Sequence, residues 1–382
     1  MKKNYLLTPG PTPLPPQVRE ALAKPIIHHR TPQFQAILKE AVEGLKYVFQ
    51  TKSEVFVLSS SGTGAMEAAL ANLLTCGDTA IIIEGGKFGE RWTELAQAYG
   101  IKTEVLKVAW GKALNIEELK NRLKASKAKV VFATLCETST GVDFDIKAIA
   151  QVVKNSAAVL AVDAISGLGV VDLKTDEWGV DVVVSGSQKG LMLPPGLGFI
   201  SVSGEKAWKL INQSRSPRYY FDLRLAKAAW EQTDTPFTTS VSLVVALNAA
   251  LKMVKEEGLE NVFKRCSKLA QGIRSAAKAL GLKLFADEGC SSRAITAVNV
   301  PAGIDGEKLV KTMRDAHGIT IAGGQAELKG KAFRIASMGY LNEFDIILAL
   351  SCLEKVLHQM GYKFELGSGL KAAQEVFLKD IL

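Results

Sequence analysis

The sequence predicts an α/β fold: a large domain with a mostly parallel sheet flanked by helices, and a smaller α+β domain at the C-terminal end. Three observations support this prediction. Short apolar runs alternate with helix-period segments up to about residue 205. The runs are continuous rather than alternating, as expected of strands that are buried on both faces. After Pro236 the pattern changes to long helices followed by short strands.

The chain begins with a segment that is rich in proline, residues 8–13 (TPGPTP). Proline has no amide hydrogen to donate and fixes φ, so this segment cannot form a helix or a central strand. We therefore expect residues 1–15 to form an extended arm, which lies on the surface or over a cleft.

Six apolar runs predict the strands of the large domain, which we assign to residues 16–250. The runs are residues 55–58, 79–83, 130–133, 159–162, 182–184 and 198–202. Between them, segments such as 65–74 and 115–123 have the apolar spacing of helices. Strands that alternate with helices form parallel sheets, and such sheets bind ligands outside the carboxyl ends of their strands.

The remaining residues, 251–382, are predicted to form the smaller domain. Two long helices are expected over residues 241–256 and 262–280, and short strands over 294–300 and 333–336. No low-complexity linker separates the two parts of the chain.

The composition excludes several classes of protein. With 382 residues, 47% hydrophobic and 23% charged, the chain is typical of a globular protein with two or three cores. The net charge of +8 comes from scattered residues, so a nucleic-acid partner is not expected. Prolines interrupt the N-terminal segment and no apolar run could span a membrane, which predicts a cytoplasmic protein.

The cysteines and histidines predict no metal site. The 5 cysteines are widely spaced and form no C-x-x-C pair, which argues against both a disulfide framework and a zinc site. His28 and His29 are adjacent, but no further ligand follows at a suitable spacing.

Two strand ends have ionisable side chains. Asp163 directly follows the apolar run 159–162, where a carboxylate is costly to bury unless it meets a cation or a hydrogen-bond donor. Lys189 follows the next run within residues 185–189 (SGSQK). Partial desolvation at such a position lowers the pKa of a lysine toward that of a nucleophilic amine.

A third motif follows the first predicted strand, residues 59–64 (SSSGTG). A turn of this kind at the start of a helix presents free N–H groups and a positive dipole end, which suit a phosphate. Alone, it is explained equally well as a capped turn, and it is neither a Walker A loop nor a dinucleotide fingerprint. Together, a phosphate cradle, an Asp for a pyridinium nitrogen and a Lys for an imine are what pyridoxal phosphate needs.

The chain resembles the class V (fold type I) pyridoxal-phosphate-dependent aminotransferases, in particular the alanine–glyoxylate and serine–pyruvate group. The matching motifs are spread over nearly the whole chain: residues 8–11 (TPGP), 28–30 (HHR), 61–63 (SGT), 88–91 (FGER), 137–141 (ETSTG), Asp163, 187–189 (SQK) and 334–335 (RI). The resemblance implies a ping-pong transaminase that moves the amino group of alanine or serine to glyoxylate or pyruvate.

The resemblance also implies a role for each site residue. Lys189 would be the Schiff-base lysine, and Asp163 would pair with the pyridine nitrogen. The other cofactor contacts would be Ser61, Gly62, Thr63 and Gln188 at the phosphate, Phe88 and Ile165 on the two ring faces, and Thr138 on the hydroxyl side. Arg334 would bind the substrate carboxylate with two parallel hydrogen bonds.

The family forms homodimers, in which Thr238 would reach the phosphate of the neighbouring subunit. Relatives often have Tyr at the position of Thr235, so this chain departs from the family pattern there. No obvious second arginine serves a distal carboxylate, although Arg30 and Arg218 are candidates.

Three alternatives remain open from the sequence. The chain could be a phosphonate- or phosphoserine-directed transaminase of the same family. It could be a cysteine desulfurase, for which Cys290 is the candidate nucleophile because residues 321–327 contain no cysteine. It could also be a hydrogenase-associated partner subunit, although the presence of Lys189, Asp163 and Arg334 together argues against a purely structural role.

Overall fold

The computed structural model describes residues 3–379. Its main sheet has seven strands in the order β2-β10-β9-β8-β5-β3-β4. The strands are β2 (Glu54–Leu58), β10 (Gly198–Val202), β9 (Val182–Gly186), β8 (Val159–Asp163), β5 (Val130–Thr134), β3 (Thr79–Glu84) and β4 (Lys102–Lys107). Only β10 runs against its neighbours, so the prediction of a mostly parallel sheet is confirmed.

Strand β4 is the strand of this sheet that the sequence did not predict. It lies at the edge of the sheet and pairs only with β3. Four of its six residues (KTEVLK) are polar or charged, and Leu106 is the only one that is buried. An edge strand with one solvated face has no continuous apolar run, so the pattern that identified the other six is missing here.

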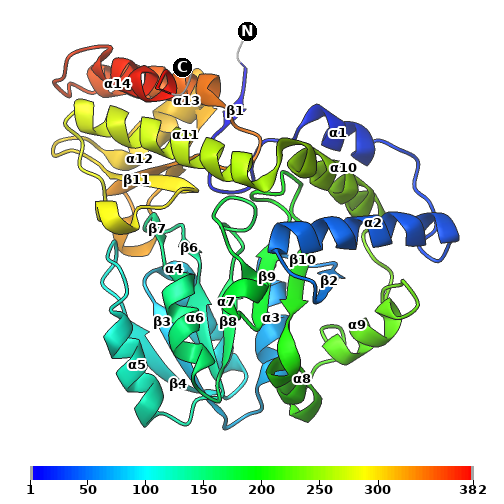
Figure 1. Ribbon diagram of the computed structural model, residues 1–382. Helices are drawn as coiled ribbons and strands as arrows, with labels where there is room; N and C mark the ends of the chain where they lie inside the picture. Colours follow the sequence, from blue (N-terminus) through cyan, green and yellow to red (C-terminus); the bar gives the residue numbers. More distant parts are fainter. Residues whose placement is uncertain (1–2, 380–382) are drawn as a thin grey trace.

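Helices cover both faces of the sheet (Figure 1). One face packs against α1 (Pro16–Leu22), α2 (Pro32–Phe49), α5 (Ile116–Ala125), α6 (Ile146–Lys154) and α10 (Val241–Glu257). The other packs against α3 (Gly62–Leu73), α4 (Lys87–Ala98), α8 (Gly204–Gln213) and α9 (Leu223–Trp230). Successive strand residues serve opposite cores, as Val131 and Phe132 do, which explains the continuous apolar runs.

A smaller body lies beside one end of the sheet. Its three-stranded antiparallel sheet has the order β11 (Ile295–Asn299), β14 (Ala332–Ala336), β13 (Ala322–Gly323). Its helices are α11 (Leu259–Ala279), α12 (Gly306–His317), α13 (Glu343–Gln359) and α14 (Ser368–Phe377). The remaining short elements of the chain are the hairpin β6 (Cys136–Glu137) and β7 (Val142–Asp143), α7 (Thr175–Trp178), and the 3-10 turns η1 (Glu288–Cys290) and η2 (Ala326–Leu328).

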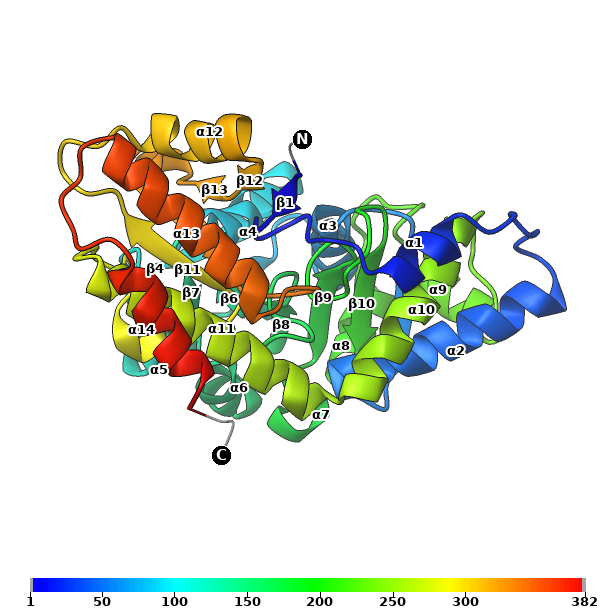
Figure 2. The same ribbon diagram turned by 90° about the horizontal axis from the view of Figure 1, so that it is seen from above.

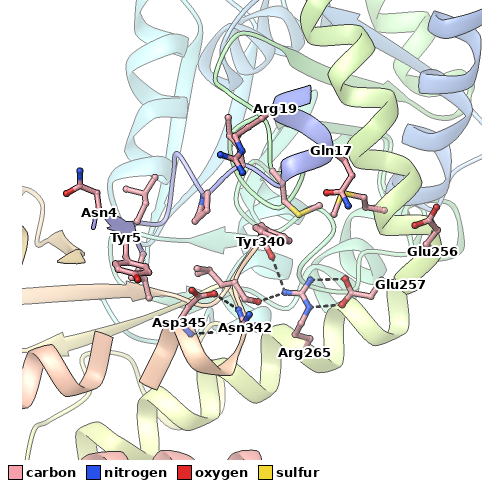
Figure 3. Close-up of a pocket in the computed structure, with 18 residues that line it drawn as sticks. Asn4, Tyr5, Gln17, Arg19, Glu256, Glu257, Arg265, Tyr340, Asn342 and Asp345 are labelled. Carbon is pink, nitrogen blue, oxygen red and sulfur yellow. Dashed lines mark hydrogen bonds and ion pairs between the residues drawn. The ribbon is translucent and has the colours of Figure 1, made fainter. Parts of the chain in front are cut away.

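Helix α11 connects the two bodies. Val262 and Cys266 in its first half belong to the large core, whereas Leu269 and Ile273 belong to the small one. Figure 3 shows the groove of about 1120 Å³ at this junction. There the Arg265 guanidinium donates to the carboxylate at the end of α10 and to two carbonyl oxygens of the loop before α13, at residues 339 and 341.

The N-terminal arm joins the small body to the carboxyl ends of the main strands. Strand β1 (Tyr5–Leu6) pairs in parallel with β12 (Ile319–Thr320). The chain then passes toward α1 (Figure 2). On the way the Thr12 N–H donates to the Gln188 carbonyl oxygen at 3.1 Å, and the Thr12 hydroxyl donates to the Lys189 carbonyl oxygen at 2.9 Å. The extended arm therefore lies directly over the residues that the sequence identified as chemically active.

Candidate active site

A cavity of about 200 Å³ lies at the carboxyl ends of β8 and β9, under the N-terminal arm. Eight of the residues that the sequence assigned to the cofactor line it: Ser61, Gly62, Thr63, Phe88, Asp163, Ile165, Gln188 and Lys189. The position agrees with the rule that open α/β sheets bind ligands outside the carboxyl ends of their strands.

Lys189 stands three residues after the end of β9 and is 9% exposed. Its ammonium group donates to the Pro9 carbonyl oxygen of the arm. Burial lowers the pKa of Lys189 to about 8, and the Arg334 and Arg91 charges act in the same direction, whereas Cys136 and Asp163 oppose the shift. A lysine with this pKa is a neutral amine for part of the time near neutral pH, and so it can act as a nucleophile or a base.

Asp163 is the last residue of β8 and is 3% exposed. Burial raises its pKa to about 7, although one carboxylate oxygen accepts a hydrogen bond of 2.8 Å from the Ile165 N–H. A buried acid with a raised pKa is stabilised by a cationic partner, which restores its ionised form. The cavity therefore contains a carboxylic acid, Asp163, and an amine, Lys189, and desolvation shifts the pKa of both.

The start of α3 forms one side of the cavity. Ser61 is the N-cap residue, and its hydroxyl accepts a hydrogen bond from the Gly64 N–H at 3.4 Å. Gly62 lies so close to the opposite wall that an added Cβ would be 2.6 Å from Ile165 Cδ1. The backbone N–H groups of this first turn and the positive end of the helix suit a phosphate.

Helix α4 presents Phe88 to the cavity, and a buried carboxylate from another strand fixes its first turn. Gly86 precedes the helix and has no side chain to cap it. Instead, a Glu137 carboxylate oxygen accepts from the Phe88 and Gly89 N–H groups, both at 3.0 Å, and Ser139 Oγ accepts from the Lys87 N–H at 3.0 Å. The sequence reasoning included Glu137 only within a motif and missed this role, because the contact joins residues about fifty positions apart.

Arg334 and Thr138 meet beside the cavity without lining it. Arg334 is 4% exposed and donates to the Thr138 and Gly323 carbonyl oxygens, at 2.8 and 3.0 Å. Burial lowers the pKa of the Arg334 guanidinium to about 10, while Glu137 opposes the shift. Arg334 thus extends from β14 of the small body to a loop of the large body, where three of its N–H donors are not used by these two bonds.

Thr238 is not brought to the cavity of its own chain. It is exposed, in the segment between α9 and α10. The hydroxyl of its neighbour Thr239 lies 3.3 Å from the Ser59 hydroxyl, which ties the segment to the end of β2.

Several lining residues were not assigned a role from the sequence: Gly10, Pro11, Arg91, Cys136, Ser166 and Pro195. Gly10 has φ of 136°, and a Cβ there would lie 2.5 Å from Lys189 Cε, so only glycine fits. Pro9 in the arm and Lys189 are 180 residues apart in sequence, and no local pattern predicts their contact.

The other residues that the sequence suggested as functional candidates lie outside the cavity. Cys290, the desulfurase candidate, is buried, with its thiol 3.6 Å from the Gly111 carbonyl oxygen, and does not line the cavity. Arg218 is buried and its guanidinium donates to Asn72 and to four backbone carbonyl oxygens. Arg30 pairs with Asp234. These residues therefore have structural partners.

The residues of the cavity fit a phosphorylated pyridine aldehyde. Within the described residues, Gln188 Oε1 in the cavity and Thr138 Oγ1 beside it are buried and have no hydrogen-bond partner. Buried polar atoms are normally paired, so these two are available to a ligand. The described part of the chain contains no cluster of three metal-ligating side chains and no helix that could cross a membrane.

Comparisons with known proteins agree with this geometry. The class V aminotransferase model matches residues 4–341. The chain is 45% identical to the soluble hydrogenase small subunit of Synechococcus sp. over 98% of both chains. It is 37% identical to L-aspartate–glyoxylate aminotransferase of Paracoccus denitrificans (98% and 96% covered) and 38% identical to serine–glyoxylate aminotransferase of Hyphomicrobium methylovorum (98% and 95%). The structure of ureidoglycine–glyoxylate aminotransferase from Bacillus subtilis superposes with a TM-score of 0.95, at 32% identity and 99% and 98% coverage.

Proposed function

The chain belongs to the class V aminotransferases, a pyridoxal-phosphate-dependent family, and we propose that it moves the amino group of alanine or serine to glyoxylate or pyruvate. One observation supports this most directly: Lys189 and Asp163 line one cavity at adjacent strand ends. Burial lowers the pKa of the lysine to about 8 and raises that of the acid to about 7.

The residues present would hold pyridoxal phosphate as follows. The first turn of α3, with Ser61, Gly62 and Thr63, would bind the phosphate together with Gln188. Phe88 and Ile165 would enclose the ring, and Thr138 would contribute its unpartnered hydroxyl. When bound, the cofactor supplies an aldehyde that bonds to amines and a ring that accepts the electron pair left at the substrate α-carbon.

The chemical steps assigned to the protein are proton transfers and charge stabilisation. Asp163 would hold a proton on the pyridine nitrogen, because an ionised carboxylate in a buried site favours a cationic neighbour. Lys189 Nζ would take the proton from the substrate α-carbon and return it, as a general base and then as a general acid. The N-terminal arm, whose Gly10 lies against Lys189, would keep water away from the amine.

The proposed preference for an amino donor without a second carboxylate follows from the partners of the arginine side chains. Arg334 would bind the α-carboxylate, which every amino acid and oxo acid shares. Arg218 is occupied by its own backbone contacts, and Arg30 by Asp234. One observation favours aspartate as a second candidate donor: Arg91 places another cation in the cavity.

The test is a panel of amino donors against glyoxylate and pyruvate, with the purified protein loaded with pyridoxal phosphate. We expect alanine or serine to give the highest kcat/KM, and glyoxylate or pyruvate to accept the amino group. A clear preference for aspartate would replace the proposed donor. A protein that takes up no cofactor and shows no transamination would favour a partner-subunit role, which the name of the hydrogenase relative suggests.

We propose further that the active unit is a homodimer in which Thr238 reaches the phosphate of the neighbouring subunit. Exposed aromatic side chains lie beside this segment: Tyr219 is 73% and Tyr220 45% exposed, and the Tyr220 ring stacks on Phe237 while the Tyr219 ring packs against it at a tilt. Exposed apolar clusters of this kind are typical of interfaces, and a twofold dimer is the commonest assembly.

Sedimentation at micromolar concentration should show a dimer, and cofactor should stabilise it because it would bind only the assembled state. Tyr219→Glu should shift the equilibrium toward monomer and weaken cofactor binding. Leu366→Glu is the matched control, because Leu366 is 68% exposed in the small body, and it should change neither property. A fully active, cofactor-loaded monomer would contradict the proposal.

A further inference from the structure

Arg91 is a cavity residue that the proposed function does not use. It lies on α4, one turn after Phe88, and its guanidinium carbon is 5.0 Å from the centre of the Phe88 ring. Its Nη1 donates to Thr63 Oγ1 at 3.3 Å. The guanidinium therefore stands between the ring-stacking residue and the first turn of α3, where the phosphate is proposed to bind.

Arg91 has no acidic partner of its own. Within residues 3–379, its side chain makes one hydrogen bond, to Thr63, and one ring contact, with Phe88, and no carboxylate oxygen lies within ion-pairing distance, although its charge acts on Asp163 at longer range. The two acids on the same face of α4, Glu90 and Glu94, pair with Lys87 instead. A guanidinium has five N–H donors, so most of those of Arg91 remain available.

The surroundings of Arg91 suit a doubly charged anion rather than a carboxylate alone. The positive end of α3 and the free N–H groups at Gly62 and Thr63 lie on the same side of the cavity. A phosphate monoester has a charge of about −1.5 to −2 near neutral pH, more than a helix end of about +0.5 neutralises. In the proposed cradle the other side chains are Ser61, Thr63 and Gln188, which are uncharged.

We propose that Arg91 supplies the positive charge that pairs with the cofactor phosphate, while its contact with Phe88 keeps the stacking ring in place. This inference rests on the proposed function, because it requires pyridoxal phosphate in this cavity. The proposal also removes the one observation in favour of an aspartate donor, because a guanidinium engaged with a phosphate and Thr63 is not free to bind a distal carboxylate.

The experiment compares two ligands that differ only in the phosphate, pyridoxal 5′-phosphate and pyridoxal. Equilibrium dialysis with cofactor-free protein gives a Kd for each ligand, independent of turnover. Arg91→Gln should weaken pyridoxal phosphate binding on the order of ten- to a hundredfold, the loss expected for one charged hydrogen bond, and leave pyridoxal binding almost unchanged. Arg91→Lys, which keeps the charge, should recover part of the loss.

Arg122→Gln is the matched control, because it makes the same substitution at an exposed arginine of α5 that does not line the cavity. It should affect neither Kd. An equal loss for both ligands in Arg91→Gln would show that the arginine acts only through Phe88 and would overturn the proposal. So would unchanged cofactor binding together with a selective loss of aspartate turnover. Failure of the parent protein to bind pyridoxal phosphate would instead contradict the proposed function.

Discussion

Replacing Lys189 by alanine should abolish transamination, with a loss of at least 10²–10⁴-fold, the range that a positioned general acid–base usually contributes. The physical reason is that Lys189 is the only lysine lining the cavity in the described structure, and its lowered pKa makes it available as a base there. The characteristic absorbance of lysine-bound cofactor should disappear as well, because no other cavity side chain can bond to an aldehyde as a primary amine.

The Lys189→Ala protein should still fold. In the parent protein, the Lys189 ammonium group makes one hydrogen bond, to the Pro9 carbonyl oxygen. Burying this charge costs free energy and adds nothing to the hydrophobic core. Circular dichroism and thermal unfolding should therefore resemble those of the parent. Lys206→Ala, which removes an exposed lysine bonded to the Ser156 carbonyl oxygen, is the control and should keep full activity.

A small primary amine added to Lys189→Ala should restore part of the turnover, because it can occupy the vacated space and accept the α-proton. Ordinary ping-pong kinetics in the variant without added amine would refute the assignment of Lys189. Loss of activity together with loss of the folded state would indicate a structural role instead.

The fold was predictable because two-sided burial leaves a strong pattern in the sequence. Residues such as Val131 and Phe132 are both buried, one in each core, so the run that contains them is apolar at every position. Strand β4 has no such run because its outer edge is solvated. What predicts a strand from the sequence is therefore how completely its side chains are buried: the edge strand β2, with four of its five residues buried, was predicted, whereas the edge strand β4 was not.

The placement of Asp163 and Lys189 in one cavity was predictable for a related reason. A buried strand that ends in Asp163 or leads into Lys189 places an ionisable group where desolvation is costly, and that contrast is visible in a single sequence. The residues that contact or position these groups have no comparable pattern in the sequence. Gly10 above Lys189 and Glu137 at the start of α4 act across the fold, and their roles depend on contacts between distant segments.

Which arginines are available to bind a ligand could not be predicted from the sequence alone either. From the sequence, the resemblance assigned Arg334 to the substrate carboxylate, Arg30 and Arg218 were candidates for a distal carboxylate, and Arg91 had no role beyond its motif. In the structure Arg218 is saturated by backbone oxygens, Arg30 is paired with an acid, and Arg91 faces the cavity. Which guanidinium is available for a ligand depends on its partners, and these are set by packing.

Replacing Arg334 by lysine should weaken the use of both the amino donor and the oxo acid, by about 1–3 kcal/mol in kcat/KM, the free energy of one charged hydrogen bond. Lysine keeps the positive charge but loses the planar fork, so it cannot hold a carboxylate with two parallel bonds while also bonding the Thr138 and Gly323 carbonyl oxygens. Both half-reactions should be affected alike, because the two substrates share only the carboxylate.

The cofactor absorbance of Arg334→Lys should be that of the parent, because Arg334 contacts the loop beside the cavity and is assigned to the substrate. Arg314→Lys provides the control: this exposed arginine of α12 pairs with Asp315 and lies outside the cavity, so its replacement should leave kcat/KM unchanged. Single-turnover measurements of each half-reaction separate substrate binding from cofactor loading. Equal kcat/KM values for Arg334→Lys and the parent on all donors, or a loss confined to one half-reaction, would show that another group binds the carboxylate.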